Sequence, residues 1–296
     1  MQGEFPTAEK NSFSFRRMWS IVDYELRWDL RKKKVLFVVT FTFIVIVLAV
    51  AYFKSFHNEG VYGNSGYLWS NIVLLLTNGF ISGIFPMVLG GVISVDSIAW
   101  EIDKGTILPL LSQPIGRSEI YFGKITEKLL VMCTLSILLV LLSVIFSSII
   151  EGSQEHLLWI IPMSFSLLLE VMVFVSFTFM LGSLVKQSGF MMLMLTGIYF
   201  FILIGSVFLM LKYGFHLWMT FIPLEGVNNL LFSLQHYSLE PSTKIFLNYN
   251  LGQSMTGGVW LYPSQLLLYS IAGAIASVMT FTIIGYVSFS RLEVKG

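Results

Sequence analysis

Long apolar runs alternate with short polar segments along this chain, and this pattern predicts helices that cross a membrane. A helix needs about 20 residues to span the hydrocarbon core of a bilayer. Six runs approach or exceed that length, at about residues 35–53, 70–95, 123–150, 157–185, 189–212 and 263–289. The pattern therefore predicts an all-α integral membrane protein, with one six-span transmembrane domain over residues 35–296.

The segment before the first run, residues 1–34, is predicted to be a separate N-terminal region. Within residues 15–31, apolar side chains recur at helical spacing, while most of the charged ones lie between them (the apolar positions are Phe15, Met18, Trp19, Val22, Leu26 and Leu30). This indicates an amphipathic helix that lies in the membrane interface or packs on a partner. The basic run at residues 31–34 leads directly into the first span and favours the interface.

A long segment, residues 213–262, separates the last two spans. Its first half is too apolar for an ordinary loop, yet Pro223 and Gly226 interrupt it before it could span a membrane. We expect short helices here, lying on the outer leaflet, followed by a polar region rich in turns.

A semi-polar segment at residues 98–124 lies between the second and third spans. Gly105-Thr106 interrupts it, and Ser112-Gln113-Pro114 breaks any helix in its middle because proline lacks an N–H. Apolar residues separate its charges. The segment predicts two short amphipathic pieces at a membrane surface joined by a turn, with Ser118 as the N-cap of the next span.

The distribution of charge predicts how the chain is oriented. Only 12% of the residues are charged, about half the fraction in a soluble domain. Fifteen of the eighteen Lys and Arg residues fall in the N-terminal segment, in residues 96–128, in the turn after the fourth span and at the C-terminus. Segments rich in Lys and Arg beside membrane spans remain on the cytoplasmic side. We therefore expect a multi-pass protein of the cytoplasmic membrane with both termini in the cytoplasm.

The chain lacks the residue patterns of common enzymes. It has no phosphate-binding loop, since Gly123-Lys124 is followed by Ile125, and no Gly-x-Ser-x-Gly or His-Glu-x-x-His motif. The four histidines match no compact metal motif, and Cys133 is a lone thiol. We therefore expect no catalytic residue, no metal and no cofactor bound to this chain.

Three residues within the predicted spans are candidates for a substrate pathway. Glu170 is the one carboxylate deep in a span, where a charge is costly unless it is paired, hydrated or protonated. Asn78 and Pro86 lie in the second span, which the proline could bend. The alternative for all three is a structural role in helix packing.

The semi-polar segment resembles the cytoplasmic segment after the second span of type-2 ABC export permeases. An acidic cluster is followed by Gly-Thr, then by Leu-Leu-Ser-x-Pro-Ile-x-Arg, then by Gly-Lys at the next span (Glu101, Asp103, Gly105, Thr106, Leu110, Leu111, Ser112, Pro114, Ile115, Arg117, Gly123 and Lys124). Pro109 departs from the pattern. The resemblance implies a coupling helix that contacts an ATPase through Glu101, Asp103, Lys104, Gly105, Thr106 and Arg117.

The resemblance also implies the partners and the energy source. The partners would be two copies of an ABC ATPase subunit, which carry ATP and Mg, and a second permease chain, identical or homologous. The lipid bilayer is the remaining partner, and no nucleic acid is expected. The implied function is ATP-driven export. The alternatives are a membrane anchor that transmits ATPase motion to an extracytoplasmic partner, and an ion-driven secondary transporter that uses Glu170.

Overall fold

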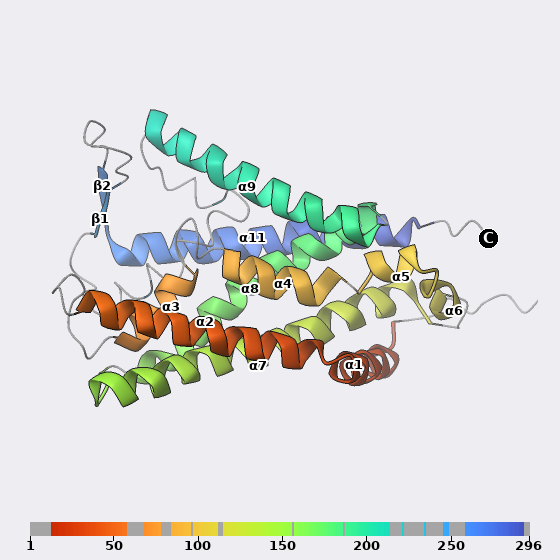
Figure 1. The fold of residues 1–296 in the computed structure, drawn as a ribbon. Helices are drawn as coiled ribbons and strands as arrows, with labels where there is room; N and C mark the ends of the chain where they lie inside the picture. The colour runs from red at the N-terminus through yellow and green to blue at the C-terminus, as the bar shows by residue number, and fades with distance from the viewer. Residues whose placement is uncertain are drawn as a thin grey trace, which may run out of the picture.

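The computed structural model describes residues 13–57, 68–77, 84–95, 97–111, 115–155, 157–185, 187–213, 221, 234, 245–248 and 258–292. Its long helices lie side by side in an elongated bundle (Figure 1). Helices α1, α5 and α6 and the last turns of α11 lie at one end of the bundle, and two short strands lie at the other end. The two ends are therefore built from different parts of the chain.

Within the described residues, four helices are long and apolar enough to cross a membrane. They are α2 (Lys34–His57), α7 (Arg117–Glu151), α8 (Ile160–Val185) with the 3₁₀ turn before it (Leu157–Trp159), and α11 (Pro263–Ser290). A further apolar helix, α9, covers Ser188–Tyr213. These helices confirm the predicted helical, membrane-spanning class and match the apolar runs from which they were predicted.

The run expected to form the second span, residues 70–95, contains two described helical stretches. These are α3 (Leu68–Thr77) and α4 (Ile84–Val95), and residues 78–83 between them lie outside the described part. Pro86 stands in the first turn of α4, where a helix has no internal partner for an N–H group anyway. The residues that would show whether the second span is one bent helix lie outside the described part.

Helix α7 begins before the third apolar run. It starts at Arg117 with Gly116 as its N-cap, so the prediction that Ser118 caps the helix is wrong. The Glu119 carboxylate accepts a hydrogen bond from the Gly116 N–H at 3.0 Å and provides the capping interaction. The charge-free residues 129–150 would extend about 33 Å as a helix, close to the thickness of the hydrocarbon core.

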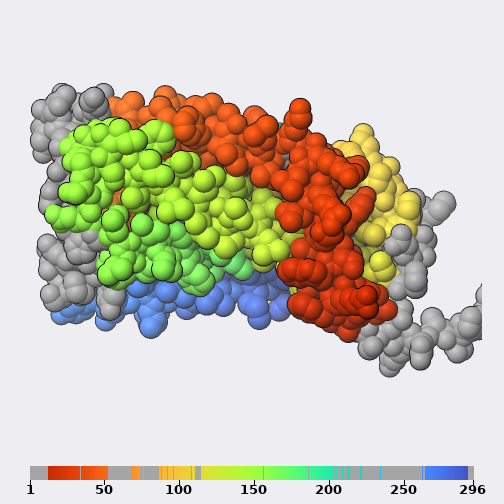
Figure 2. Space-filling view, turned by 90° about the horizontal axis from the view of Figure 1, so that it is seen from below, coloured from red at the N-terminus to blue at the C-terminus, as the bar shows by residue number. Residues whose placement is uncertain are grey.

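Helix α1 (Phe15–Arg31) has the predicted bounds and lies across one end of the bundle (Figure 2). Its buried face consists of Met18, Ile21, Val22, Glu25 and Asp29. Three of the six apolar residues that predicted the helix, Phe15, Trp19 and Leu30, are instead exposed. The helix therefore has two apolar faces, one packed on the protein and one free to contact a membrane.

A small antiparallel sheet corrects the all-α expectation. Strand β1 (Ile245–Asn248) pairs with β2 (Gly258–Leu261), with Ile245 opposite Leu261 and Asn248 opposite Gly258. Each strand has four residues, too few for an alternating pattern to stand out in the sequence. Most of the short helices expected within residues 213–262 fall outside the described residues.

Helix α8 is the centre of the bundle, because α4, α7, α9 and α11 all pack against it. Glycine residues allow the closest approaches of neighbouring helices to α8. A Cβ atom on Gly285 of α11 would lie 2.3 Å from the Tyr121 hydroxyl oxygen and 3.1 Å from the Met180 Cα of α8. A Cβ on Gly90 of α4 would lie 2.8 Å from the Phe174 Cβ. Such contacts hold transmembrane helices together by packing, since lipid offers no hydrophobic driving force.

The contact at Gly285 predicts a loss of stability when a methyl group is added. Gly285→Ala should lower the free energy of unfolding by about 1–3 kcal/mol, because the backbone of α8 cannot move away from the new Cβ. The measurement is the thermal unfolding midpoint of the purified chain in detergent. Gly197→Ala is the matched control, because its Cβ would meet nothing within 4 Å. Equal midpoints for the two variants would contradict the close contact.

Candidate functional site

The semi-polar segment forms two short helices, as the sequence predicts. They are α5 (Ala99–Asp103) and α6 (Ile107–Leu111). The turn between them contains Gly105, whose φ of 70° lies in the left-handed region that glycine adopts most easily. The Thr106 hydroxyl donates to the Glu101 carbonyl oxygen at 3.4 Å across this turn. Buried Ile98 and Ile107 anchor both pieces to the bundle.

Three charged residues of this segment, Glu101, Asp103 and Arg117, bond to residues of other helices. Lys124 Nζ of α7 donates to Glu101 Oε1 at 2.7 Å, and the Ser188 hydroxyl of α9 donates to Asp103 Oδ2 at 3.3 Å. Arg117 Nη1 donates to the Ser290 carbonyl oxygen at the end of α11, at 2.5 Å. The segment is therefore joined directly to α7 and α9, and Arg117 joins the start of α7 to α11.

The predicted coupling residues differ in how far they can reach a partner. Asp103, Lys104, Thr106 and Arg117 are exposed, and Gly105 is half-buried. The Glu101 side chain is only 17% exposed because it turns inward to Lys124. The four exposed residues therefore present a polar surface to a partner, whereas Glu101 belongs to an ion cluster inside the protein.

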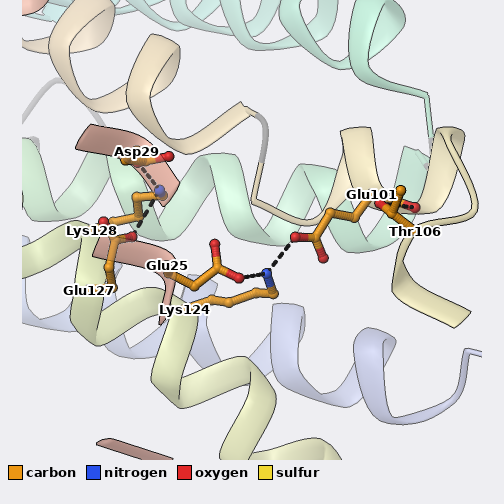
Figure 3. A network of polar contacts seen from close by, with 7 residues as sticks. All are labelled: Glu25, Asp29, Glu101, Thr106, Lys124, Glu127 and Lys128. Carbon is orange, nitrogen blue, oxygen red and sulfur yellow. Dashed lines mark hydrogen bonds and ion pairs between the residues drawn. The ribbon is translucent and has the colours of Figure 1, made fainter. Parts of the chain in front are cut away.

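This ion cluster contains Glu25 and Asp29 of α1, Glu101 of α5, and Lys124, Glu127 and Lys128 of α7 (Figure 3). Lys124 Nζ lies 2.5 Å from Glu25 Oε1 as well as 2.7 Å from Glu101 Oε1, and its side chain is 0% exposed. Lys128 pairs with Asp29 and lies 2.8 Å from Glu127 Oε2. Lys124 therefore bridges three helices.

The cluster holds more negative than positive charge, with four carboxyl groups facing two lysines. Burial raises the pKa of Glu101, the nearby Lys124 ammonium lowers it, and the neighbouring Glu25 carboxylate raises it again. The net direction is upward. Removing a lysine from this cluster would leave buried carboxylates with no cation, which costs more than losing a surface ion pair.

The sequence analysis missed Glu25, Asp29, Glu127 and Lys128. A signal was present, because Glu25 and Asp29 are four residues apart on α1, and Lys124 and Lys128 have the same spacing on α7. Residues four apart lie on one helix face, so two acids can meet two lysines. The acids were overlooked because carboxylates on an interfacial helix are normally exposed to water.

A second anchor ties the start of α1 to the start of α7. Glu119 Oε1 accepts hydrogen bonds from the Ser14 N–H at 2.6 Å and from Arg17 Nη2 at 2.9 Å. Between this anchor and the ion cluster, a Cβ on Gly123 would lie 3.1 Å from the Ile21 Cβ. The absence of a side chain at position 123 therefore lets α1 lie close against α7.

A cleft of about 930 Å³ lies between α1 and the two short helices. Aromatic Tyr24 and Trp28 line it from α1, and Trp100 lines it from α5. Lys32 Nζ lies 4.9 Å from the ring centre of Trp28 and 4.3 Å from that of Trp100, a pair of cation–π contacts that joins the two walls. Thr106 of the turn, and Pro109 and Leu110 of α6, also line the cleft.

Of the predicted pathway residues, Glu170 and Pro86 belong to helices that do not line this cleft. Glu170 is 1% exposed in the middle of α8, and neither of its carboxyl oxygens has a hydrogen-bond partner within the described structure. Helix α4 packs beside it, since a Cβ on Gly90 would lie 3.3 Å from the Val171 carbonyl oxygen. Pro86 is in α4, and Asn78 lies outside the described residues. The structure therefore does not bring the three together in a described site.

Comparison with known families gives one match. A family model described as "ABC-2 family transporter protein" matches residues 19–294. The match runs from within α1 to beyond the end of α11, so it includes the ion cluster, the cleft and all the long helices. No curated protein matches the sequence.

The ion cluster predicts a large effect of removing its central cation. Lys124→Met should lower the free energy of unfolding by about 3–5 kcal/mol, because Glu25 and Glu101 would remain buried without a cation. Burial raises the pKa of the Glu101 carboxyl above its ordinary value, so the variant should regain stability as the pH falls and the folded state takes up a proton. Unfolding followed at several pH values measures both effects.

Lys104→Met is the control for Lys124→Met, because it removes an exposed lysine from the neighbouring turn. It should change the stability by less than about 0.5 kcal/mol. Adding Glu25→Gln to Lys124→Met should restore part of the loss. If Lys124→Met and Lys104→Met unfold alike at all pH values, the cluster does not stabilise the fold.

Proposed function

We propose a coupling mechanism for this chain, which belongs to the ABC-2 transporter family and is the membrane permease of an ATP-driven transporter. Members of this family work with a partner ATPase and do not hydrolyse ATP themselves, which agrees with the missing phosphate-binding loop. In the proposal, ATP and Mg²⁺ bind the partner, and the complete transporter has two ATPase subunits and two permease chains. The direction of transport is export.

The proposed docking site for the ATPase is the cleft between α1 and α5–α6. The observation that carries the proposal is that this cleft lies directly over the ion cluster, with Glu25 and Glu101 belonging to both. Exposed aromatic side chains beside fixed charges are typical of protein interfaces. Exposed Lys104, Thr106 and Asp103 extend the same surface around the turn.

The proposed transmission of force uses the contacts of Lys124. When ATP closes the two ATPase subunits, each pushes on α1 and on the α5–α6 pair. Because Lys124 bonds to both Glu25 and Glu101, a displacement of either element is passed to α7. Helix α7 has 35 residues and would extend about 52 Å, so tilting its start moves its far end. The contacts Asp103–Ser188 and Arg117–Ser290 extend the motion to α9 and α11.

The proposed topology has six spans, which requires α3 with α4 to form the second and α9 to form the fifth. Both termini are cytoplasmic. Two observations support this orientation: fifteen of the eighteen basic residues fall on one predicted side, and α1, α5, α6 and the last turns of α11 share one end of the bundle (Figure 1). The strands β1 and β2 would then lie outside the cell.

The proposal assigns Glu170 to the transport pathway as a second element. It is enclosed by the bundle in this conformation, so it could meet a substrate only after α4 and α8 separate. An enclosed carboxyl without a partner favours such a change, because water or a substrate would hydrogen-bond it. An ion-driven transporter is no longer the preferred alternative, since the family uses ATP. A membrane anchor that moves an external partner remains the second candidate.

Filling the cleft should prevent the ATPase from binding. Thr106→Trp places an indole in the cleft without altering the ion cluster. The expected result is loss of the ATPase subunit in a pull-down of the tagged chain from native membranes, followed by an ATPase assay and mass spectrometry. Arg27→Trp is the control, because Arg27 is an exposed residue of α1 outside the cleft.

Two outcomes of this pull-down would count against the proposal. An ATPase that co-purifies equally with Thr106→Trp and with Arg27→Trp binds somewhere other than the cleft. A wild-type chain that purifies with no ATPase would contradict the proposed assembly itself. The amount of each variant in the membrane is measured in parallel, so that poor folding is not mistaken for poor binding.

The proposed orientation predicts which cysteines are reached from outside an intact cell. In a Cys133→Ser background, Glu155→Cys should react with a membrane-impermeant maleimide, because it lies in the exposed turn after α7. Arg27→Cys should react only after the membrane is permeabilised, because α1 lies on the cytoplasmic side. The reverse labelling pattern would invert the topology.

A further inference from the structure

A groove outside the proposed coupling site runs between α8 and α11, at the end of the bundle that holds the last turns of α11. Its volume is about 490 Å³. Ser183 and Leu184 line it from α8, and Ile283, Val287 and Ser288 line it from α11. Arg291, which follows the last residue of α11, closes one end. The groove therefore combines apolar walls with a cationic end.

The walls of the groove face outward. Leu184, Ile283 and Ile284 are about half exposed, and they belong to helices apolar enough to span a membrane. In a bilayer these side chains would contact acyl chains. The two helices are joined behind them by a hydrogen bond from the Ser288 hydroxyl to the Ser183 carbonyl oxygen at 3.2 Å. The floor of the groove is therefore closed, and a ligand would enter from the lipid side.

The end of the groove carries the guanidinium group of Arg291. Arg291 is exposed, and within the described residues it has no ion pair. Arg117 does not line the groove, but its Nη1 donates to the carbonyl oxygen of Ser290, the residue before Arg291. Among the residues that the structure describes, no carboxylate lines this groove. The charge there favours an anion.

We propose that this groove binds an anionic phospholipid of the adjacent leaflet, with its phosphate on Arg291 and its acyl chains along the walls formed by α8 and α11. Arginine pairs with phosphate through two parallel hydrogen bonds, and a basic pocket at the end of membrane helices is suited to acidic headgroups. A helix of a second protein is about 10 Å across and would not fit a groove of this size.

The bound lipid would stabilise the place where three elements meet. Arg117, the first residue of α7, bonds to the carbonyl oxygen of Ser290, so an anion on the adjacent Arg291 would fix the end of α11 to which α7 is joined. This inference rests on the chain being a membrane protein. It does not depend on where the ATPase docks, so the two proposals can fail separately.

Native mass spectrometry of the full-length chain in detergent tests the proposal. Phosphatidylglycerol and phosphatidylcholine with identical acyl chains are titrated, and the bound lipids are counted. The wild-type chain should prefer phosphatidylglycerol, and Arg291→Gln should reduce that preference about fivefold, the effect of one charge near a lipid surface. Arg31→Gln is the matched control, because it removes an exposed arginine at the end of α1.

Val287→Trp is a second variant, which fills the groove without changing any charge. It should weaken the binding of phosphatidylglycerol while Arg291 remains in place, so the test does not rest on one variant folding. Glycerol 3-phosphate is added in a separate titration. It should fail to displace the lipid, because it has no acyl chain to lie on the apolar walls.

Four results would overturn the proposal. Equal binding of the two lipids would show that the headgroup is not recognised. Equal losses with Arg291→Gln and Arg31→Gln would show a general surface attraction. Displacement by glycerol 3-phosphate would indicate a site for soluble phosphate esters. Loss of a dimer instead of a lipid in Val287→Trp would show that a second copy of the chain occupies the groove.

Discussion

A buried cation needs a negative partner, and this constraint fixes the position of α1 and α5 on the rest of the protein. Lys124 is 0% exposed, and its ammonium can be held there only because Glu25 and Glu101 both reach it. The two carboxylates come from different helices, so each helix must lie where its acid meets the lysine. Gly123 makes the arrangement possible, since it leaves room for Ile21 of α1.

Different forces hold the two parts of the bundle. At the end that carries α1 and α5, the helices are joined by ion pairs and hydrogen bonds, including those of Glu119 with Arg17 and Ser14. Along the long helices, close packing at Gly90 and Gly285 is the main contact. This difference between the polar end and the long helices follows from their surroundings. Inside lipid there is no hydrophobic driving force between helices, and close packing takes its place. A displacement of the polar end therefore reaches helices that contact one another mainly by close packing and less by hydrogen bonds from helix to helix.

The contacts of the segment around α5 and α6 give the coupling proposal its physical basis. Glu101 reaches α7 and Asp103 reaches α9, while Arg117 joins the start of α7 to the end of α11. These three bonds lead to α7, α9 and α11, which are far apart in the sequence. A partner that moves this segment would act on several membrane helices at once, and an anionic lipid on Arg291 would act on the same junction.

The sequence by itself determined the membrane class, the helical bounds of α1, the two short pieces α5 and α6, and the family resemblance, because apolar run lengths and turn residues are local signals. The tertiary structure decided which residues meet. The partners of Glu25 and Asp29 follow only from the packing of α1 on α7. Glu101, which was expected at the surface, belongs to a buried cluster. The pairing of β1 with β2 also needed the fold. A local sequence pattern reports the length and the period of a helix or strand. The partner of a buried charge instead comes from an element about 100 residues away in the sequence.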